Sequence, residues 1–141
     1  MKDYDDVNAT AAVDLPGALH ATARHENVEV LFEQQDTVAY RKPDETGLQF
    51  IDSRPEIVDG VTFRMNIGVN KNAAPKEYII NDATTDALVV FRGHSYFSMV
   101  TGAMRVTKND AGGLEGSFNG RATLDGRLYE ISCREFKVVL P

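Results

Sequence analysis

The chain of 141 residues has no tryptophan, only one cysteine (Cys133) and only three histidines. A single cysteine excludes an intrachain disulfide. A chain of this length can bury roughly two-thirds of its unfolded surface, so it needs no disulfide to fold. No apolar run approaches the roughly 18 residues that a membrane-spanning helix requires. We therefore expect no transmembrane segment and a fold that is held together by a packed core.

Positive charge is also scarce, and it is unevenly distributed. The formal net charge is -6, which disfavours nucleic acid and anionic membranes as partners. Residues 1–60 carry 13 acidic and 5 basic side chains, a balance of -8, whereas residues 61–141 carry 8 and 10, a balance of +2. We expect no nucleic-acid partner, and the acidic half would suit a basic protein partner.

Residue types that commonly carry catalysis are few and poorly placed. His20 and His25 are five positions apart, so on one strand they would face opposite sides and could not share a metal ion. His94 lies in an expected turn. Cys133 is expected on the apolar face of its strand, where a thiol is inert and its pKa is raised. We therefore assign no catalytic, cofactor-binding or metal-binding residue.

The acidic residues form small clusters, all of them in the N-terminal arm or in expected loops. They are Asp3, Asp5 and Asp6; Asp44 and Glu45; and Asp82 and Asp86. Glycosidase chemistry would need two such carboxylates held across a cleft. Residues 109–113 resemble a calcium loop but lack its alternating oxygen ligands, so we interpret them as a hairpin turn.

Carbohydrate-binding β modules commonly present exposed tryptophans, and this chain has none. The tyrosines that could replace them are Tyr40, Tyr78, Tyr96 and Tyr129. Tyr129 is expected to face the core, which weakens the case for sugar binding.

The chain divides into an arm and one domain. Residues 1–16 are acidic and rich in alanine, and we interpret them as a flexible arm before a single β domain at 17–141. Short apolar runs then alternate with turn residues about every ten positions, the pattern of an all-β protein. The expected strands are 18–24, 27–34, 37–41, 47–52, 61–69, 77–81, 87–92, 95–107, 114–124 and 127–140. Alanines in 10–25 leave a short helix there as an alternative.

The sharpest local prediction concerns the C-terminal hairpin. Asp125-Gly126 is a strong two-residue turn signal, and it pairs residue 124 with residue 127. The expected pairs are Ala122 with Tyr129, Gly120 with Ile131 and Phe118 with Cys133 on the inner face, and Arg121 with Glu130 and Asn119 with Ser132 outside. The apolar phase of the last strand then slips, which predicts a β-bulge between Ser132 and Glu135. Beyond the bulge the expected pairs are Gly116 with Phe136, Leu114 with Val138 and Glu115 with Lys137.

The preceding strand is expected to join the same sheet. A five-residue loop at 109–113 places Met104 opposite Phe118, Val106 opposite Gly116 and Val100 opposite Ala122. Residues 95–140 then form a three-stranded meander, and glycines on its apolar face allow strong curling. The predicted fold is all-β and antiparallel: a curved β-sandwich or a closed β-barrel of about 8–10 strands.

One stretch resembles a known type of domain. It comprises Gly102-Ala103-Met104-Arg105-Val106-Thr107, Asn109-Asp110 and Leu114-Glu115-Gly116-Ser117-Phe118. This order of strand, turn and strand resembles small bacterial envelope and lipoprotein domains of unknown function, although the lipobox cysteine is missing. The resemblance implies a bacterial periplasmic or envelope location if a leader has been removed, since the N-terminus lacks the apolar segment of a signal peptide.

Three functions follow from these patterns. The leading hypothesis is a non-catalytic structural or interaction module, an accessory protein of a bacterial envelope or of a larger particle, with a protein partner or self-association. The alternative is a calycin-like barrel that holds a small apolar ligand. The third is a hydrolase whose site is built from loops. The interior of the fold distinguishes the first two hypotheses. A barrel that holds a ligand must contain a lined cavity, whereas an interaction module can have a filled core.

Overall fold

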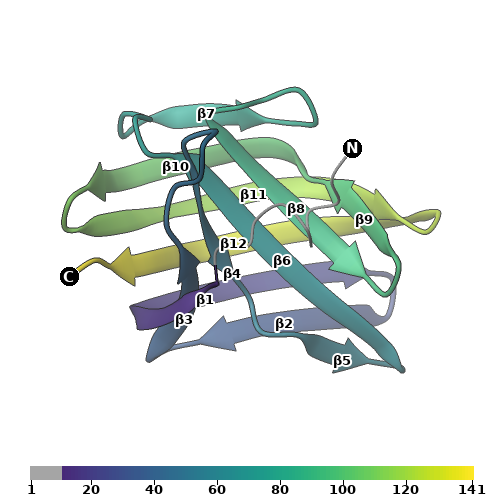
Figure 1. The fold of residues 1–141 in the computed structure, drawn as a ribbon. Coiled ribbons are helices and arrows are strands. Elements are labelled where there is room, and N and C mark those ends of the chain that lie inside the picture. Colours follow the sequence, from purple (N-terminus) through teal and green to yellow (C-terminus); the bar gives the residue numbers. More distant parts are fainter. Residues whose placement is uncertain (1–10) are drawn as a thin grey trace.

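The computed structural model describes residues 11–141, which form twelve antiparallel strands and no helix (Figure 1). The strands are β1 (Val13–His25), β2 (Val28–Gln34), β3 (Thr37–Arg41), β4 (Leu48–Asp52), β5 (Glu56–Val58), β6 (Val61–Asn70), β7 (Glu77–Ile80), β8 (Ala87–Gly93), β9 (Tyr96–Met99), β10 (Thr101–Asp110), β11 (Gly113–Leu124) and β12 (Arg127–Val139). The described part of the chain holds no helix long and apolar enough to cross a membrane.

The strands form one sheet that curls into a half-barrel. Its order is β7-β10-β11-β12-β1-β3-β4-β6-β8-β9, with β2 added beside β1 and β5 beside β6. The all-β antiparallel curved fold is therefore confirmed. The shape lies between the two that the sequence left open, because the end strands β7 and β9 do not pair with each other.

The curled sheet has two layers that β1 joins. Residues 13–16 of β1 pair with β3, and residues 17–25 lie between β12 and β2. We call β3, β4, β5, β6, β8 and β9 layer A, and β2, β7, β10, β11, β12 and the second part of β1 layer B. In Figure 1 the strands of layer A cross those of layer B at a steep angle. Buried side chains of both layers form one core.

The predicted C-terminal hairpin register is confirmed at every expected pair, from Ala122 with Tyr129 to Leu114 with Val138. Asp125 and Gly126 have φ values of 52° and 75°, which fit the two-residue turn predicted from their sequence. The predicted bulge is also present. Gly116 pairs with Phe136 and Phe118 with Cys133, so β12 has one more residue in this interval than β11.

The expected strand 95–107 is interrupted. Val100 separates β9, which pairs with β8, from β10, which pairs with β11. The Val100 amide donates to the Val89 carbonyl at 2.9 Å, so the chain is still bound to layer A where it crosses to layer B. The meander therefore consists of β10, β11 and β12, and β9 belongs to the other layer.

Three smaller differences concern boundaries. Strand β1 begins at Val13, four residues before the predicted domain boundary, and residues 1–10 of the predicted arm lie outside the described residues. The loop expected at 109–113 is a tighter turn, because Asp110 pairs with Gly113 and an irregularity near Thr107 restores the predicted register. Strand β5 was not expected, although its Asp59-Gly60 turn was.

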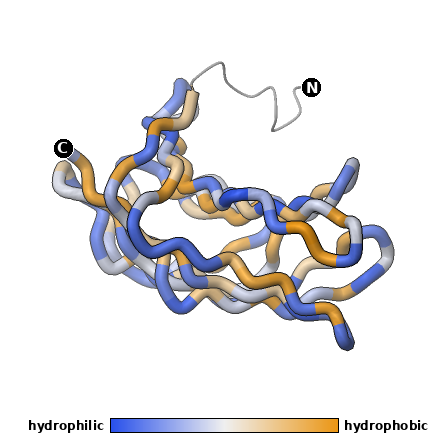
Figure 2. The backbone as a smooth tube through the Cα atoms, turned by 90° about the horizontal axis from the view of Figure 1, so that it is seen from below, coloured by the Kyte–Doolittle hydropathy of each residue, from blue (hydrophilic) through white to orange (hydrophobic). Residues whose placement is uncertain are grey.

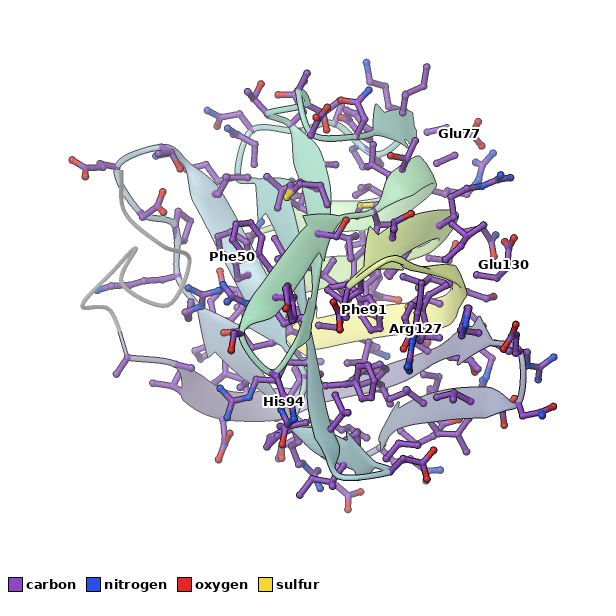
Figure 3. The ribbon with its side chains drawn as sticks, turned by 90° about the vertical axis from the view of Figure 1, so that its right-hand side faces the viewer. Phe50, Glu77, Phe91, His94, Arg127 and Glu130 are labelled. Atoms are coloured by element: carbon purple, nitrogen blue, oxygen red, sulfur yellow. The ribbon has the colours of Figure 1, made fainter. Side chains whose placement is uncertain are left out.

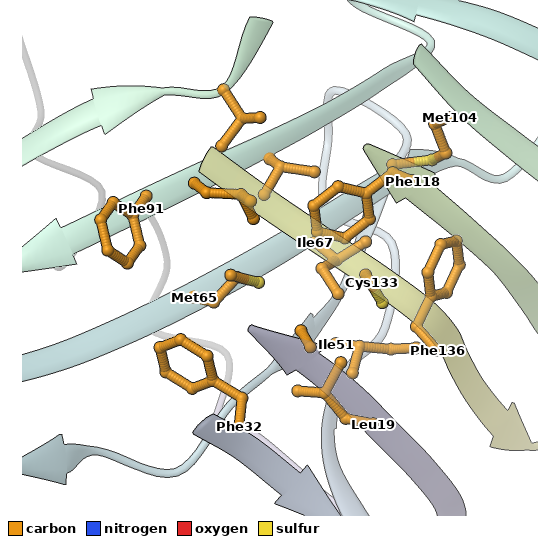
Figure 4. Packing of buried hydrophobic residues seen from close by; sticks show 14 of the residues in the cluster. Leu19, Phe32, Ile51, Met65, Ile67, Phe91, Met104, Phe118, Cys133 and Phe136 are labelled. Carbon is orange, nitrogen blue, oxygen red and sulfur yellow. The ribbon is translucent and has the colours of Figure 1, made fainter. Parts of the chain in front are cut away.

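The interior is filled by side chains from both layers. Phe91 stacks on Phe63 at 5.7 Å between ring centroids and meets Tyr129 of β12 edge-on at 5.1 Å. Figure 4 shows the same convergence around Cys133 and Phe118, and Figure 2 shows the alternation of polar and apolar residues along the strands. One core therefore belongs to both layers.

Candidate functional site

A groove of about 950 Å³ lies on the outer face of layer B. It is lined by Thr22, Arg24, Thr101, Gly102, Asn119, Gly120, Arg121, Glu130, Ile131 and Ser132. Four strands contribute to it, namely β1, β10, β11 and β12. Figure 3 shows Glu130 and Glu77 projecting from this side of the molecule.

The strand registers place small side chains in a row across the groove. Thr22 pairs with Ser132, Ser132 with Asn119, and Asn119 with Ala103. At the two ends of this row stand Leu31 of β2 and Ile79 of β7, which are 49% and 74% exposed. Short side chains on neighbouring strands leave depth between longer ones, so Thr22, Ser132 and Asn119 form the floor of the groove.

A ladder of alternating charge borders the floor on one side. Glu29, Arg24, Glu130 and Arg121 follow one another on the adjacent strands β2, β1, β12 and β11. Arg24 Nε donates to Glu29 Oε2 at 3.2 Å, and all four side chains are exposed. Exposed pairs of this kind contribute little to stability. Along this ladder, the arginine donors and the glutamate acceptors alternate, and a binding partner could pair with each of them in turn.

His20 lies beyond the other side of the floor. It is 8% exposed, its Nδ1 hydrogen-bonds to Glu33, and Glu135 is its neighbour on β12. His25 lies on the opposite side of β1, with its ring 5.4 Å from that of the buried Tyr129, as the five-residue spacing predicted. His94 occupies the turn between β8 and β9 with φ of 51°.

The histidine hydrogen bonds found among residues 11–141 do not involve a nucleophile. They join His20 to Glu33 and His25 to the Leu128 carbonyl at 2.8 Å, whereas an activated nucleophile has a base within hydrogen-bond reach. Burial raises the pKa of Cys133 to about 12, which keeps its thiol protonated and inert at neutral pH. Over the same residues, no group of three or more His, Cys, Asp or Glu side chains could hold a metal ion.

Two acidic loop residues, Asp44 and Asp110, stabilise turns. Asp44 Oδ1 accepts from the Thr46 amide at 2.8 Å, and Asp110 Oδ1 accepts from the Gly112 amide at 2.7 Å. The region that resembles a calcium loop is thus a hairpin turn. The group at Asp3, Asp5 and Asp6 lies outside the described residues.

Of the four tyrosines considered for sugar binding, three are buried. The Tyr40 hydroxyl donates to Gln49 Oε1 at 2.7 Å, the Tyr78 hydroxyl donates to the Ala74 carbonyl at 2.6 Å, and Tyr129 is in the core as expected. Burial raises the pKa of both Tyr40 and Tyr78. Only Tyr96, at 53% exposure, is available to a ligand.

A second, much smaller cavity of about 90 Å³ lies at one end of the half-barrel, bordered by Phe63, Leu124, Tyr129 and His94 among others. Pockets for small ligands usually measure roughly 300–1,000 Å³. The cavity is therefore too small for such a ligand.

The sequence predicted some of the strand pairs that line the groove, but it did not predict a groove. It predicted the outward pairs Asn119 with Ser132 and Arg121 with Glu130, but it did not predict that β1 brings Thr22 and Arg24 beside them. Comparisons of the chain with protein-family models, with curated proteins and with solved structures found no match.

Proposed function

We propose that the protein is a non-catalytic binding module and that the groove on layer B receives a protein partner. The observation that carries this proposal is the groove itself: about 950 Å³ on an open sheet face, with a floor of small side chains and a border of alternating charge. Exposed Leu31 and Ile79 at its two ends supply apolar anchors. Interfaces commonly combine such anchors with a polar rim.

The filled interior favours this function over the calycin-like alternative. The rings of Phe63, Phe91 and Tyr129 occupy the centre of one end, and Phe118 and Phe136 lie 6.4 Å apart at the other. A small apolar ligand would find little space between them, so we place the binding surface on the outside. The buried, protonated thiol of Cys133 likewise argues against hydrolysis through a cysteine nucleophile.

The cellular role that we propose is an accessory protein of a bacterial envelope or of a larger particle. It rests on the resemblance of residues 102–118 to envelope domains. A protein partner with alternating charges would match the ladder of Glu29, Arg24, Glu130 and Arg121. Because these pairs are exposed, we expect the association to weaken as the salt concentration rises.

A photocrosslinking amino acid in place of Asn119 tests the proposal in cells of the source organism. We expect one discrete adduct, and it should be lost when Ser132→Arg fills the floor of the groove. The matched control carries the crosslinker at Glu45, an exposed loop residue outside the groove. An adduct of twice the chain's mass would identify self-association at the groove. The same adducts from both positions, or none from Asn119, would disprove the groove as the binding surface.

A broad hydrolase screen of the purified protein tests the absence of catalysis. Turnover that disappears when His20, His25 and His94 are together replaced by Gln would overturn the binding-only proposal.

A further inference from the structure

Strand β7 forms an open edge of layer B. It is an end strand of the sheet, and among the described strands it pairs only with β10. Figure 1 shows β7 along the upper border of the molecule. An edge strand presents amides and carbonyls to which the strand of another chain can bind.

The hydrogen bonds of β7 show which of its backbone groups face the open side. The Val106 amide donates to the Lys76 carbonyl at 2.9 Å, so these two residues form a hydrogen-bonded pair of the antiparallel ladder. Backbone direction alternates along a strand, so Tyr78 and Ile80 also direct their amides and carbonyls to β10. The amide and the carbonyl of Ile79 therefore point away from β10, to the open side.

Ile79 also presents an apolar side chain to solvent. This side chain is 74% exposed on the outer face of layer B, whereas the neighbouring Tyr78 and Ile80 are buried. The amide of Asn81 faces the same open side as that of Ile79, but it donates to Thr84 Oγ1 at 3.1 Å within its own turn. At Ile79, β7 thus combines an exposed apolar side chain with backbone groups that another strand can bind.

The charges around Ile79 are complementary to those of a second copy in antiparallel orientation. With Ile79 on a two-fold axis, residues that are equally distant from it face each other across the two chains. Lys76 of one copy then faces Asp82 of the other, and both side chains are exposed. Glu77, which lies 3.7 Å from Arg105 of its own chain, faces the neutral Asn81. No two like charges meet in this register.

The edge of layer B at β2 lacks this complementarity. β2 pairs with β1, and its exposed apolar residue is Leu31. With Leu31 on a two-fold axis, Glu29 of one copy would face Glu33 of the other. Like charges directly opposite each other destabilise a strand pair. The charges therefore favour β7 over β2 as the edge for self-association.

We propose that two copies of the chain associate through β7, which pairs with itself antiparallel about Ile79. The two Ile79 peptides exchange two backbone hydrogen bonds, and the two side chains pack together on the outer face. Layer B then continues from one copy into the other, with both grooves on the same side. Because each copy contributes one short strand, the dimer is weak and depends on concentration. The dimer forms without a further partner, so it is independent of what the groove binds.

Sedimentation velocity of the purified full chain over a wide range of concentration tests the proposal. We expect the sedimentation coefficient to rise with concentration towards that of a dimer. Ile79→Lys brings two like charges together on the axis and should weaken dimerisation by about tenfold or more. The matched control is Leu128→Lys, since Leu128 is an exposed apolar residue of β12, and this variant should dimerise as the unsubstituted chain does. A chain that is monomeric at every concentration, or equal weakening by both substitutions, would overturn the proposal.

A disulfide trap tests the position of the axis. Ile79→Cys places two thiols opposite each other, with their Cα atoms about 5.5 Å apart, which is within the range of a disulfide. In a glutathione buffer we expect far more disulfide-linked dimer from this variant than from Leu128→Cys. The native Cys133 is buried and does not compete. Equal yields from the two variants would show that Ile79 does not lie on the axis.

A charge exchange tests the contact between Lys76 and Asp82. Lys76→Asp places two carboxylates opposite each other at both ends of the paired strands, so it should weaken the dimer. Adding Asp82→Lys to the same chain restores opposite charges and should restore most of the dimer, which a loss of folding in the single variant would not predict. No loss in the single variant, or no recovery in the double variant, would overturn pairing about Ile79.

Discussion

Cys133 shows how its position in β12 controls the chemistry of a single side chain. It is 1% exposed, it pairs with Phe118 on β11, and burial raises its pKa to about 12. The thiolate is the reactive form of cysteine. Burial therefore protects Cys133 from thiol reagents in two ways, because it blocks their access and keeps the thiol protonated.

We predict that Cys133 in the native protein reacts with a thiol reagent at pH 8 at least about a hundredfold more slowly than in the unfolded chain. The comparison is made by following labelling with and without denaturant. One equivalent of label should be incorporated in denaturant. Rapid labelling of the native protein would show that β12 does not hold this residue in the core.

The same group predicts a pH dependence of stability. The pKa of Cys133 is raised from the ordinary 9.0 to about 12 in the folded protein. The protonated thiol therefore contributes its full share to the free energy of unfolding below pH 9, and this share is lost as the pH rises towards 12. The free energy of unfolding should therefore fall over this interval. The variant Cys133→Val should show a shallower fall, measured by urea titration at each pH. Equal slopes in the two proteins would contradict the assignment.

Gly116 occupies a position where a side chain has no room. A Cβ there would lie 2.4 Å from the Arg105 carbonyl oxygen and 2.5 Å from the Phe136 ring. We predict that Gly116→Ala lowers the free energy of unfolding by about 1–3 kcal/mol, because the backbone contact cannot relax as a flexible side chain would. The adjacent Ser117→Ala is the control and should change stability by less than about 0.5 kcal/mol. If Gly116→Ala were as stable as the unsubstituted protein, β10 and β11 could move apart at this position without a loss of stability.

At the scale of elements, the bulge in β12 keeps two apolar sets on one face. Ile131 and Cys133 lie before it and Phe136 and Val138 after it, and all four are buried. Without the additional residue, the second pair would turn to the outer face, since side chains alternate along a strand.

Deleting Arg134 should consequently destabilise the protein by more than about 4 kcal/mol or prevent folding. Substituting the same exposed residue, as Arg134→Ala, should cost less than about 0.5 kcal/mol. Urea titration of both variants makes the comparison. A deletion variant as stable as the substitution would mean that the strand accommodates either register.

Sequence reasoning worked for these elements where the signal is local. The Asp125-Gly126 turn sets the register of β11 and β12, and the apolar phase along β12 locates the bulge. It failed where the determinant is distant in the chain. Residues 95–107 form an unbroken strand pattern, and only the crossing between the two layers explains the interruption at Val100. Strand β5 has three residues, too few for a periodic signal.

The candidate site was predictable to the same extent. The outward residues of β11 and β12 follow from the hairpin register, whereas the contribution of β1 depends on a pairing between opposite ends of the chain. A second apolar cluster, formed by Phe50, Leu88 and Val90 on the outer face of layer A, was not predicted for another reason. Leu88 and Val90 belong to the continuous apolar run of β8, which indicates a strand buried on both faces without indicating what covers the second one.

At the scale of the whole molecule, the shared core predicts that both layers unfold together. Phe91 belongs to layer A and Phe118 to layer B, yet both lie in one cluster. Replacing either by Ala should lower stability by about 3–5 kcal/mol and keep a single transition. Far-ultraviolet circular dichroism and tyrosine fluorescence should give coincident curves. Separate transitions for the two probes would show that the layers are independent units.

The pairing of β1 with β12 also has a consequence during synthesis. Strand β1 leaves the ribosome first among the described strands, but it cannot pair with β12 until the end of the chain has been made. The paired residues are Gly17 to Arg24 of β1 and Val138 to Glu130 of β12. Hairpins of layer A, such as β8 with β9, join neighbouring segments and can form while translation continues. Layer B can close only once β12 has emerged from the exit tunnel. Until then the apolar side of β1 is open to chaperones and to misassembly with neighbouring nascent chains.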